Sequence, residues 1–163
     1  MKNRGFTLIE LVIVLILLSL SVALVTPSLS RFSKRVELKT AAQKTSGILR
    51  YFRSESIQKG IVHQVLFDSE SREVRVRALE KEEKEGKKKE ETSSTEKRYI
   101  LPRGIQMKEL KIPSPETPSD LPAIEFYPNG GSNGGSVLLD TADQKGFRIK
   151  VHFLTGMVEV EEA

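Results

Sequence analysis

A single carboxylate, Glu10, lies near the start of an otherwise unbroken apolar run that extends from Phe6 to Val25. An ionised side chain in hydrocarbon costs about 2.5–3.5 kcal/mol on insertion scales, so a glutamate in this position indicates a function and requires a partner. The run contains no basic residue. The partner of Glu10 therefore cannot come from the same segment.

Two interpretations of this apolar run compete. The residues before it include Lys2 and Arg4, whose positive charges favour a cytoplasmic N-terminus. A cleaved signal peptide would need a site after small residues at the far end of the run, and residues 21–28 offer only poor sites of this kind. A retained membrane helix fits better, because residues 6–25 amount to 20 residues and roughly 20 are needed to cross the hydrocarbon core.

The residues around Gly5 resemble the class III signal of type IV pilins and type II secretion pseudopilins. A short basic leader ends at Gly5, Phe6 follows, Glu10 comes four residues later, and the apolar run continues in the same register. The resemblance implies that a prepilin peptidase cleaves between Gly5 and Phe6 on the cytoplasmic side, and that the new amine of Phe6 is methylated. It also implies that the helix is retained in the inner membrane.

The same resemblance implies a partner for Glu10, namely the free amine of Phe6 in a neighbouring subunit of a filament. A buried charge without a partner is strongly destabilising, so a pair that forms only on docking would set the axial register of the subunits. The alternative is that Glu10 is an accidental charge in a membrane anchor.

Helical periodicity continues beyond the apolar run, over residues 28–60. Apolar and small residues recur at spacings near three and four, with basic residues largely between them, which predicts an amphipathic continuation of the helix. Pro27 is expected to bend or loosen the helix near the membrane surface, and Gly60 to end it. One stripe is expected to pack against a sheet: Leu29, Phe32, Val36, Thr40, Thr45, Ile48, Leu49, Phe52 and Ser56.

An extended pattern follows, and residues 61–163 are predicted to form a β-rich head. Residues 61–67 and 73–79 flank a polar connection, which predicts a hairpin. Residues 80–98 carry seven acidic and seven basic side chains and cannot bury a core, so we interpret them as a loop between strands. The alternative for residues 80–91 is a solvated helix of Glu–Lys pairs.

The remaining strands are predicted from short apolar runs separated by turn residues. Residues 99–112 indicate a strand pair or a long interrupted strand, and a proline-rich irregular connection follows. The glycine-rich residues 129–135 are interpreted as a flexible hairpin loop, because no helix follows them as a phosphate-binding loop requires. The last strands are expected at 123–127, 136–139, 147–154 and 157–160, with a turn at Thr155 and Gly156.

This C-terminal half is similar to the GspH/FimT group of minor pseudopilins and minor pilins. Residues 124–130 read Ile-Glu-Phe-Tyr-Pro-Asn-Gly, and a Gly/Ser loop, an apolar strand and a strand ending in Thr-Gly-Met-Val follow in that order. The resemblance implies an α+β, pilin-like fold, in which a long N-terminal helix packs on an antiparallel β-sheet head. The expected parts are a leader (1–5), a transmembrane half-helix (6–27), an amphipathic half-helix (28–60) and a periplasmic head (61–163) with the charged loop 80–98.

The composition provides few groups for catalysis or metal binding. The chain has no cysteine, so neither a disulfide nor a thiolate metal site can form. His63 and His152 each lie in a predicted strand, at its surface or boundary, and match no catalytic signature. Asp140 and Asp143 lack the regularly spaced oxygen ligands of a calcium loop, which leaves calcium as a weaker alternative. We expect no enzyme activity and no cofactor.

Two functions remain open. The first is a minor pseudopilin, a structural subunit of the type II secretion pseudopilus that supports export of folded proteins across the outer membrane. Its partners would be other pseudopilins, the prepilin peptidase and the inner-membrane assembly platform. The alternative is a FimT-like minor pilin of a type IV pilus, acting in pilus initiation, adhesion or DNA uptake.

DNA uptake would need a basic patch that neutralises phosphates. Arg75 and Arg77 alternate on one predicted strand, and Arg148 and Lys150 alternate on another. Against such a patch, the chain ends in three glutamates within residues 159–162, and loss of the leader lowers the formal net charge of the side chains from +4 to +2. Nucleic acid is therefore not expected as a partner.

Overall fold

The computed structural model describes the backbone of residues 7–79, 96–142 and 144–163; side chains 22–31 and 144 lie outside the description. The chain divides into two units, Met1–Val36 and Glu37–Ala163. The helix α1 spans Leu8–Lys59, and its assignment continues through Pro27. All strands that the structure describes belong to the second unit, which is called the head below.

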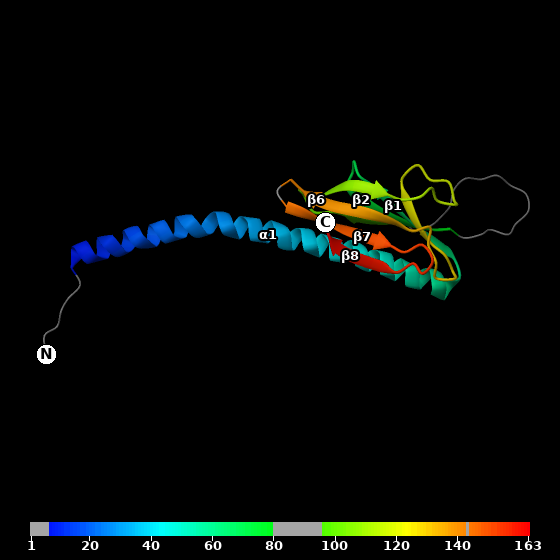
Figure 1. The fold of residues 1–163 in the computed structure, drawn as a ribbon, viewed down its shortest axis with the longest axis horizontal. Helices are drawn as coiled ribbons and strands as arrows, with labels where there is room; N and C mark the ends of the chain where they lie inside the picture. The colour runs from blue at the N-terminus through cyan, green and yellow to red at the C-terminus, as the bar shows by residue number, and fades with distance from the viewer. Residues whose placement is uncertain (1–6, 80–95, 143) are drawn as a thin grey trace, which may run out of the picture. The chain divides into compact units, whose positions relative to one another are not determined.

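The described strands form two four-stranded antiparallel sheets (Figure 1). The first sheet has the order β3-β2-β1-β5 and consists of β1 (Val62–Asp68), β2 (Glu73–Leu79), β3 (Lys97–Ile100) and β5 (Ala123–Phe126). The second sheet has the order β4-β6-β7-β8 and consists of β4 (Gln106–Lys111), β6 (Gly135–Thr141), β7 (Gln144–Val151) and β8 (Val158–Glu162). The predicted α+β class and the antiparallel pairing are confirmed.

The end of α1 matches the prediction. Gly60 follows the last helical residue with a φ of 68°, the left-handed conformation that glycine adopts without steric cost. Its N–H donates to the carbonyl of Ser56 at 3.0 Å and satisfies one of the carbonyls left over at a helix end. The chain then reverses directly into β1.

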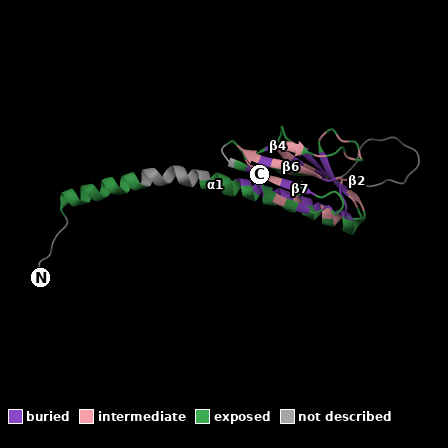
Figure 2. Ribbon diagram, viewed as in Figure 1, coloured by how far each residue is buried: buried purple, intermediate pink, exposed green. Residues whose placement is uncertain are grey.

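The buried face of α1 differs in part from the predicted stripe. The prediction was wrong for Phe32, Val36 and Thr40, which are exposed, and the side chain of Leu29 lies outside the description. The buried positions are Leu38, Ala41, Ala42, Thr45, Ser46, Leu49, Phe52 and Ser56 (Figure 2). Most of these buried positions carry alanine, serine or threonine. Such small side chains let the helix approach a sheet closely. A search for apolar periodicity does not identify them, because serine and threonine are polar.

The hairpin of β1 and β2 is confirmed, with a register from Val62↔Leu79 to Asp68↔Glu73. The Asp68 carboxylate closes the turn by accepting the backbone N–H groups of Glu70 (3.1 Å) and Ser71 (3.0 Å). Hydrogen bonds from Ser71 lower the pKa of Asp68. This is the local side chain-to-backbone bonding for which aspartate is favoured in turns.

The predicted charged loop was wrong at its C-terminal end. Lys97 and Arg98 belong to β3, where they pair with Val76 and Arg75. An edge strand tolerates such charges, since one of its edges meets solvent. Glu96 immediately precedes β3, and residues 80–95 of the predicted loop lie outside the described residues.

The glycine-rich segment 129–135 is not a hairpin loop, because β5 and β6, which it joins, lie in different sheets. Gly130, Gly131, Ser132 and Gly134 are buried. Gly134 has a φ of 75°, and a Cβ there would lie 2.8 Å from the Cβ of Phe153. The glycines therefore serve close packing at a crossover between the sheets.

One hydrophobic core joins α1 and both sheets. Its members include Leu49 and Phe52 from α1, Phe67 and Phe126 from the first sheet, and Ile149 from the second. The central strand β1 is buried along both faces. The head is thus a single packing unit built from one helix and two sheets.

Candidate processing and assembly site

The predicted processing junction, Gly5–Phe6, lies outside the described residues. The description begins at Thr7, immediately before α1, and places Glu10 in the first turn of this helix. Glu10 is exposed. The geometry therefore bears on Glu10 and on the helix surface around it.

Thr7 and Glu10 form a helix cap that the sequence analysis missed. The Thr7 hydroxyl accepts the backbone N–H of Glu10 at 3.2 Å, and the Thr7 carbonyl accepts the N–H of Leu11 at 3.2 Å. Thr-x-x-Glu before an apolar run is the signature of a capping box and could have been recognised from the sequence. A carboxylate in the first turn also interacts favourably with the helix dipole, by about 0.3–1 kcal/mol at exposed sites.

Apart from Glu10 and Ser19, the described helix surface from Leu8 to Leu20 is apolar on every side. The large hydrophobic side chains from Leu8 to Leu20 are all exposed, with exposed fractions from 40% at Val12 to 82% at Leu8. A helix that is apolar all round is normally buried. Among the residues that the structure describes, no helix is long and apolar enough to cross a membrane.

The basic residues considered for phosphate binding are engaged with acidic or polar groups of the head. Arg75 contacts Asp68 (3.0 Å) and Glu73 (3.1 Å). The other pairs are Arg77 with Gln64 (2.6 Å), Arg148 with Glu109 (3.0 Å) and Lys150 with Glu161 (2.6 Å). Arg75 and Arg77 lie on β2 in the first sheet, whereas Arg148 and Lys150 lie on β7 in the second. The arrangement stabilises the sheet surfaces and assembles no common basic patch from these residues.

The two histidines lie in different environments. His63 in β1 is buried, with its Nδ1 2.9 Å from the hydroxyl of Ser56, so the expectation of a surface position was wrong for it. The buried position arises because His63 faces α1 from the central part of the first sheet, beside Phe52. His152 is exposed in the turn after β7.

Of the two aspartates weighed for calcium, Asp140 accepts a hydrogen bond from Lys108 at 2.8 Å, and Asp143 lies outside the described residues. No group of three or more His, Asp or Glu residues that could hold a metal ion occurs in the described part of the chain.

A buried carboxylate on β5, that of Glu125, was not anticipated as a structural centre. One oxygen accepts from Gln64 Nε2 (3.1 Å) and the backbone N–H of Thr117 (3.1 Å). The other accepts from the N–H of Glu116 (2.9 Å) and the hydroxyl of Tyr127 (3.2 Å). Burial and the adjacent Glu125 raise the pKa of the Tyr127 phenol well above its ordinary value, so this group remains a hydrogen-bond donor.

The network fastens the proline-rich connection between β4 and β5 to the first sheet. Gln64 also donates to the Thr117 carbonyl at 3.1 Å, and Arg77 donates to the Pro118 carbonyl at 3.0 Å. In sequence, Glu125 is one polar residue between Ile124 and Phe126, a pattern that indicates an outward position in an ordinary strand. The covering connection makes this position fully buried.

Comparison with known proteins agrees with the motif and the fold. Residues 1–26 match the prokaryotic N-terminal methylation motif. The type II secretion system protein H of Xanthomonas campestris is 26% identical over 155 residues, which cover 95% of this chain and 81% of that protein.

Two solved structures show the same fold at low sequence identity. The minor pseudopilin EpsH from the type 2 secretion system of Vibrio cholerae has a TM-score of 0.57 and 17% identity, covering 77% of this chain and 97% of that one. The type IV minor pilin FimU of Pseudomonas aeruginosa has a TM-score of 0.55 and 16% identity, covering 80% of this chain and 92% of that one.

The chain therefore combines the fold of these pilin-like structures with the prokaryotic N-terminal methylation motif at residues 1–26.

Proposed function

We propose that the chain is a minor pseudopilin, a structural subunit of a type II secretion pseudopilus that supports export of folded proteins across the outer membrane. The observation that carries the proposal is the combination of the methylation motif at residues 1–26 with similarity to a secretion protein over 95% of the chain. The role is structural and involves neither catalysis nor a cofactor.

The proposal includes the steps of maturation. A prepilin peptidase cleaves between Gly5 and Phe6, and the amine of Phe6 is methylated. Residues 6–27 then anchor the protein in the inner membrane as a single pass, and residues 28–60 continue into the periplasm, where the β-rich residues 61–163 lie. Supporting observations are the basic leader and the helix surface from Leu8 to Leu20, which is exposed on all sides in the single chain.

The partners in this proposal are other pseudopilins and the inner-membrane assembly platform. Glu10 supplies the carboxylate that meets the Phe6 amine of a neighbouring subunit. This assignment is supported by an acidic group on an apolar helix surface, together with the absence of any basic residue between Phe6 and Val25 in the sequence.

Mass spectrometry of the membrane-bound protein tests maturation. The expected first residue is N-methylated Phe6. An N-terminus near Ser28 would instead establish an ordinary signal peptide, and an intact Met1 with unmodified leader would contradict processing.

Deletion of the gene tests the function itself. Loss of the protein is expected to leave folded secretion substrates in the periplasm, with rescue by the intact gene. The second candidate, a type IV minor pilin, is favoured by the likeness to FimU. Normal secretion combined with lost pili or lost DNA uptake would select this candidate and reject the first.

A further inference from the structure

Positive charge is concentrated in the part of α1 that directly follows the proposed anchor, residues 28–36, which is called the basic flank below. The basic flank carries Arg31, Lys34 and Arg35 and no acidic residue; the next charged residues, Glu37 and Lys39, are opposite in sign. Its formal charge of +3 exceeds the +2 of the side chains that remain after loss of the leader, so the rest of that chain sums to −1.

The helix places the basic flank next to the lipid headgroups when residues 6–25 cross the hydrocarbon. Lys34 and Arg35 follow Val25 by nine and ten residues, which is about 14–15 Å along an α-helix. The headgroup layer occupies about 5–8 Å of this distance, and unscreened attraction extends roughly 8 Å further at physiological ionic strength. Both charges therefore lie within electrostatic reach of the headgroup phosphates.

The direction of the side chains brings these charges closer to the membrane. Every Cα–Cβ bond of an α-helix tilts toward the helix N-terminus, which in α1 is the direction of the apolar run. Lysine and arginine also have long stems that carry the charged group along the helix to the interface. The basic flank thus presents its cationic groups toward the headgroups.

Exposed apolar side chains of the same segment fit an interfacial position. Phe32 is 68% exposed and Val36 is 48% exposed. Phe32 follows Val25 by seven residues, or about 10 Å of helix, close to the outer limit of the headgroup layer. Basic residues interleaved with exposed aromatic and aliphatic ones on a helix are typical of binding at the surface of an anionic membrane.

We propose that the basic flank binds the headgroups of anionic phospholipids, with Lys34 and Arg35 on the phosphates and Phe32 at the interface. An arginine guanidinium can bind a phosphate group through two parallel hydrogen bonds. The inference rests on the proposed function, because it requires residues 6–27 to be a membrane anchor.

The test measures which lipid gathers around the flank of the full chain in phosphatidylcholine nanodiscs. The chain has no cysteine, so Ser33→Cys, at an exposed position of the flank, takes a donor fluorophore at a single site. A small fraction of the lipid carries an acceptor on its acyl chain and is either phosphatidylglycerol or phosphatidylcholine. Energy transfer is expected to show phosphatidylglycerol enriched at least about threefold, with less enrichment at about 0.5 M than at about 0.05 M salt.

Variants of the flank identify the groups responsible. Lys34→Glu combined with Arg35→Glu is expected to abolish the enrichment, because both attractive charges become repulsive. Lys34→Arg combined with Arg35→Lys keeps both charges and is expected to retain the enrichment.

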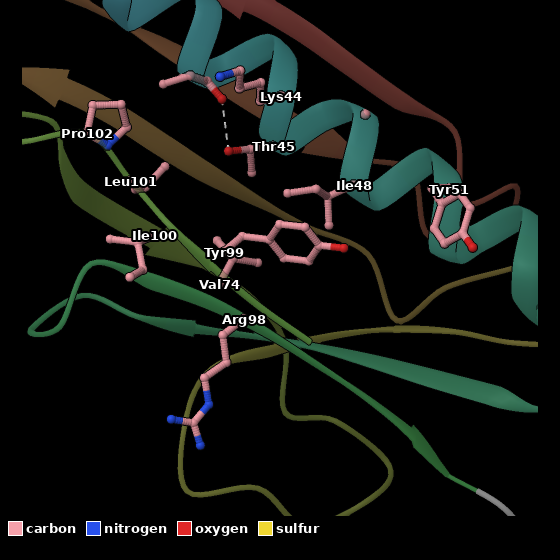
Figure 3. Close-up of a pocket in the computed structure, with 12 residues that line it drawn as sticks. Lys44, Thr45, Ile48, Tyr51, Val74, Arg98, Tyr99, Ile100, Leu101 and Pro102 are labelled. Atoms are coloured by element: carbon pink, nitrogen blue, oxygen red, sulfur yellow. Dashed lines mark hydrogen bonds between the residues drawn. The ribbon is translucent and has the colours of Figure 1, made fainter. Parts of the chain in front are cut away.

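The matched control reverses two charges on the head, through Lys44→Glu combined with Arg103→Glu. Both residues are exposed, and Lys44 lines a groove of about 650 Å³ between α1 and β3 (Figure 3). This variant is expected to leave the enrichment unchanged.

Three results would overturn the inference: equal energy transfer to both lipids, enrichment that survives reversal of Lys34 and Arg35, and equal loss of enrichment in the head control. Self-association of the full chain that the flank reversal abolishes, without lipid enrichment, would assign the flank to a second copy. Co-elution of the chain with the nanodisc separates these results from failure of the proposed function. A chain that does not co-elute would contradict the anchor itself, and the inference with it.

Discussion

At His63, the hydrogen bonds of a neighbouring serine define the role of Nδ1 as a donor. The hydroxyl of Ser56 donates its single proton to the carbonyl of Phe52 at 2.9 Å. The same oxygen, 2.9 Å from Nδ1 of His63, must then accept. Nδ1 of His63 therefore carries a proton, and the ring is held inside the head between α1 and β1.

Burial lowers the pKa of His63 below its ordinary value of 6.5; Glu55 opposes this effect, and Lys59 and Lys97 reinforce it. Below pH 6.5 the unfolded chain consequently binds more protons than the folded one. The contribution to stability is present above pH 6.5 and is lost as the pH falls through the pKa of the folded state.

We predict that His63→Gln reduces the loss of stability on acidification. The glutamine amide can still donate to Ser56 but does not titrate. Denaturant midpoints at about pH 7.5 and about pH 5.5 should differ less in the variant than in wild type. His152→Gln, which replaces the exposed histidine, is the control. An unchanged difference between the two midpoints in His63→Gln would contradict the assignment.

Glu125 combines complete burial with four hydrogen-bond donors on one carboxylate. Glu125→Gln keeps the shape but turns one oxygen into an amide nitrogen, which meets donors instead of acceptors. We expect a loss of about 2–3 kcal/mol in the free energy of unfolding, measured by chemical denaturation. Glu159→Gln, the same change on an exposed strand position, should stay within about 0.5 kcal/mol. Similar values for both variants would show that the Glu125 network contributes little.

The turn between β7 and β8 is the element where helix, loop and sheet meet. Gly156 has a φ of 60°, and a Cβ there would lie 2.6 Å from the Gly130 carbonyl oxygen. Arg53 of α1 donates to the carbonyls of Thr155 (2.8 Å) and Gly130 (3.2 Å). One guanidinium thus joins the β7–β8 turn to the glycine-rich crossover.

Two glycines with similar backbone angles separate steric crowding from conformational strain. Gly60 has a φ of 68°, but a Cβ added there would meet only open space. Gly60→Ala should therefore cost only about 1 kcal/mol, whereas Gly156→Ala should cost roughly 3 kcal/mol or more because the backbone must also move. Thermal midpoints of the two variants provide the comparison. Equal shifts of the thermal midpoint in the two variants would mean that the backbone of the β7–β8 turn relaxes at little cost in free energy.

The elements with local signals were predictable from the sequence. Gly60 predicted the end of the helix, and the polar residues between β1 and β2 predicted a hairpin, which the structure confirms. Sheet membership had no local signal: β5 and β6 adjoin in sequence through a glycine-rich segment typical of a hairpin, yet separate into two sheets. Their separation depends on long-range packing that buries Gly130 and Gly134.

The site shows the same division between local and distant causes. Glu10 was recognisable because a charge in an apolar run is conspicuous in one dimension, and its capping partner Thr7 lies only three residues away. The buried role of Glu125 was not recognisable, because these hydrogen-bond donors to its carboxylate come from Gln64 and from residues 116–117, on other parts of the chain. A buried polar group can be recognised only when the segments that cover it are known.

The whole molecule joins two units with opposite surface character. The head buries its apolar groups in one core shared by α1 and both sheets, whereas the first part of α1 exposes its apolar side chains on every side. Exposed apolar area of this extent marks an interaction surface. Within the proposed function, membrane lipid and then neighbouring subunits would cover it.

The final prediction separates two roles for Glu10 at the level of the assembled protein. If Glu10 serves only the helix start, removing the cap through Thr7→Val should impair assembly as much as Glu10→Leu does. If Glu10 pairs with the Phe6 amine of a neighbour, only Glu10→Leu should reduce crosslinking to other subunits, by about tenfold or more, because a neighbouring amine would lose its counter-charge.

Membrane insertion and cleavage after Gly5 provide the internal controls for this experiment. Both should survive Glu10→Leu, since removing a charge from an apolar helix favours insertion by about 2.5–3.5 kcal/mol. Crosslinking in the producing bacterium, a secretion assay and N-terminal mass spectrometry should be performed on the same strains. Normal crosslinking and normal secretion by Glu10→Leu would exclude intersubunit pairing, since the variant retains the anchor and the Thr7 cap but lacks the carboxylate that pairing requires.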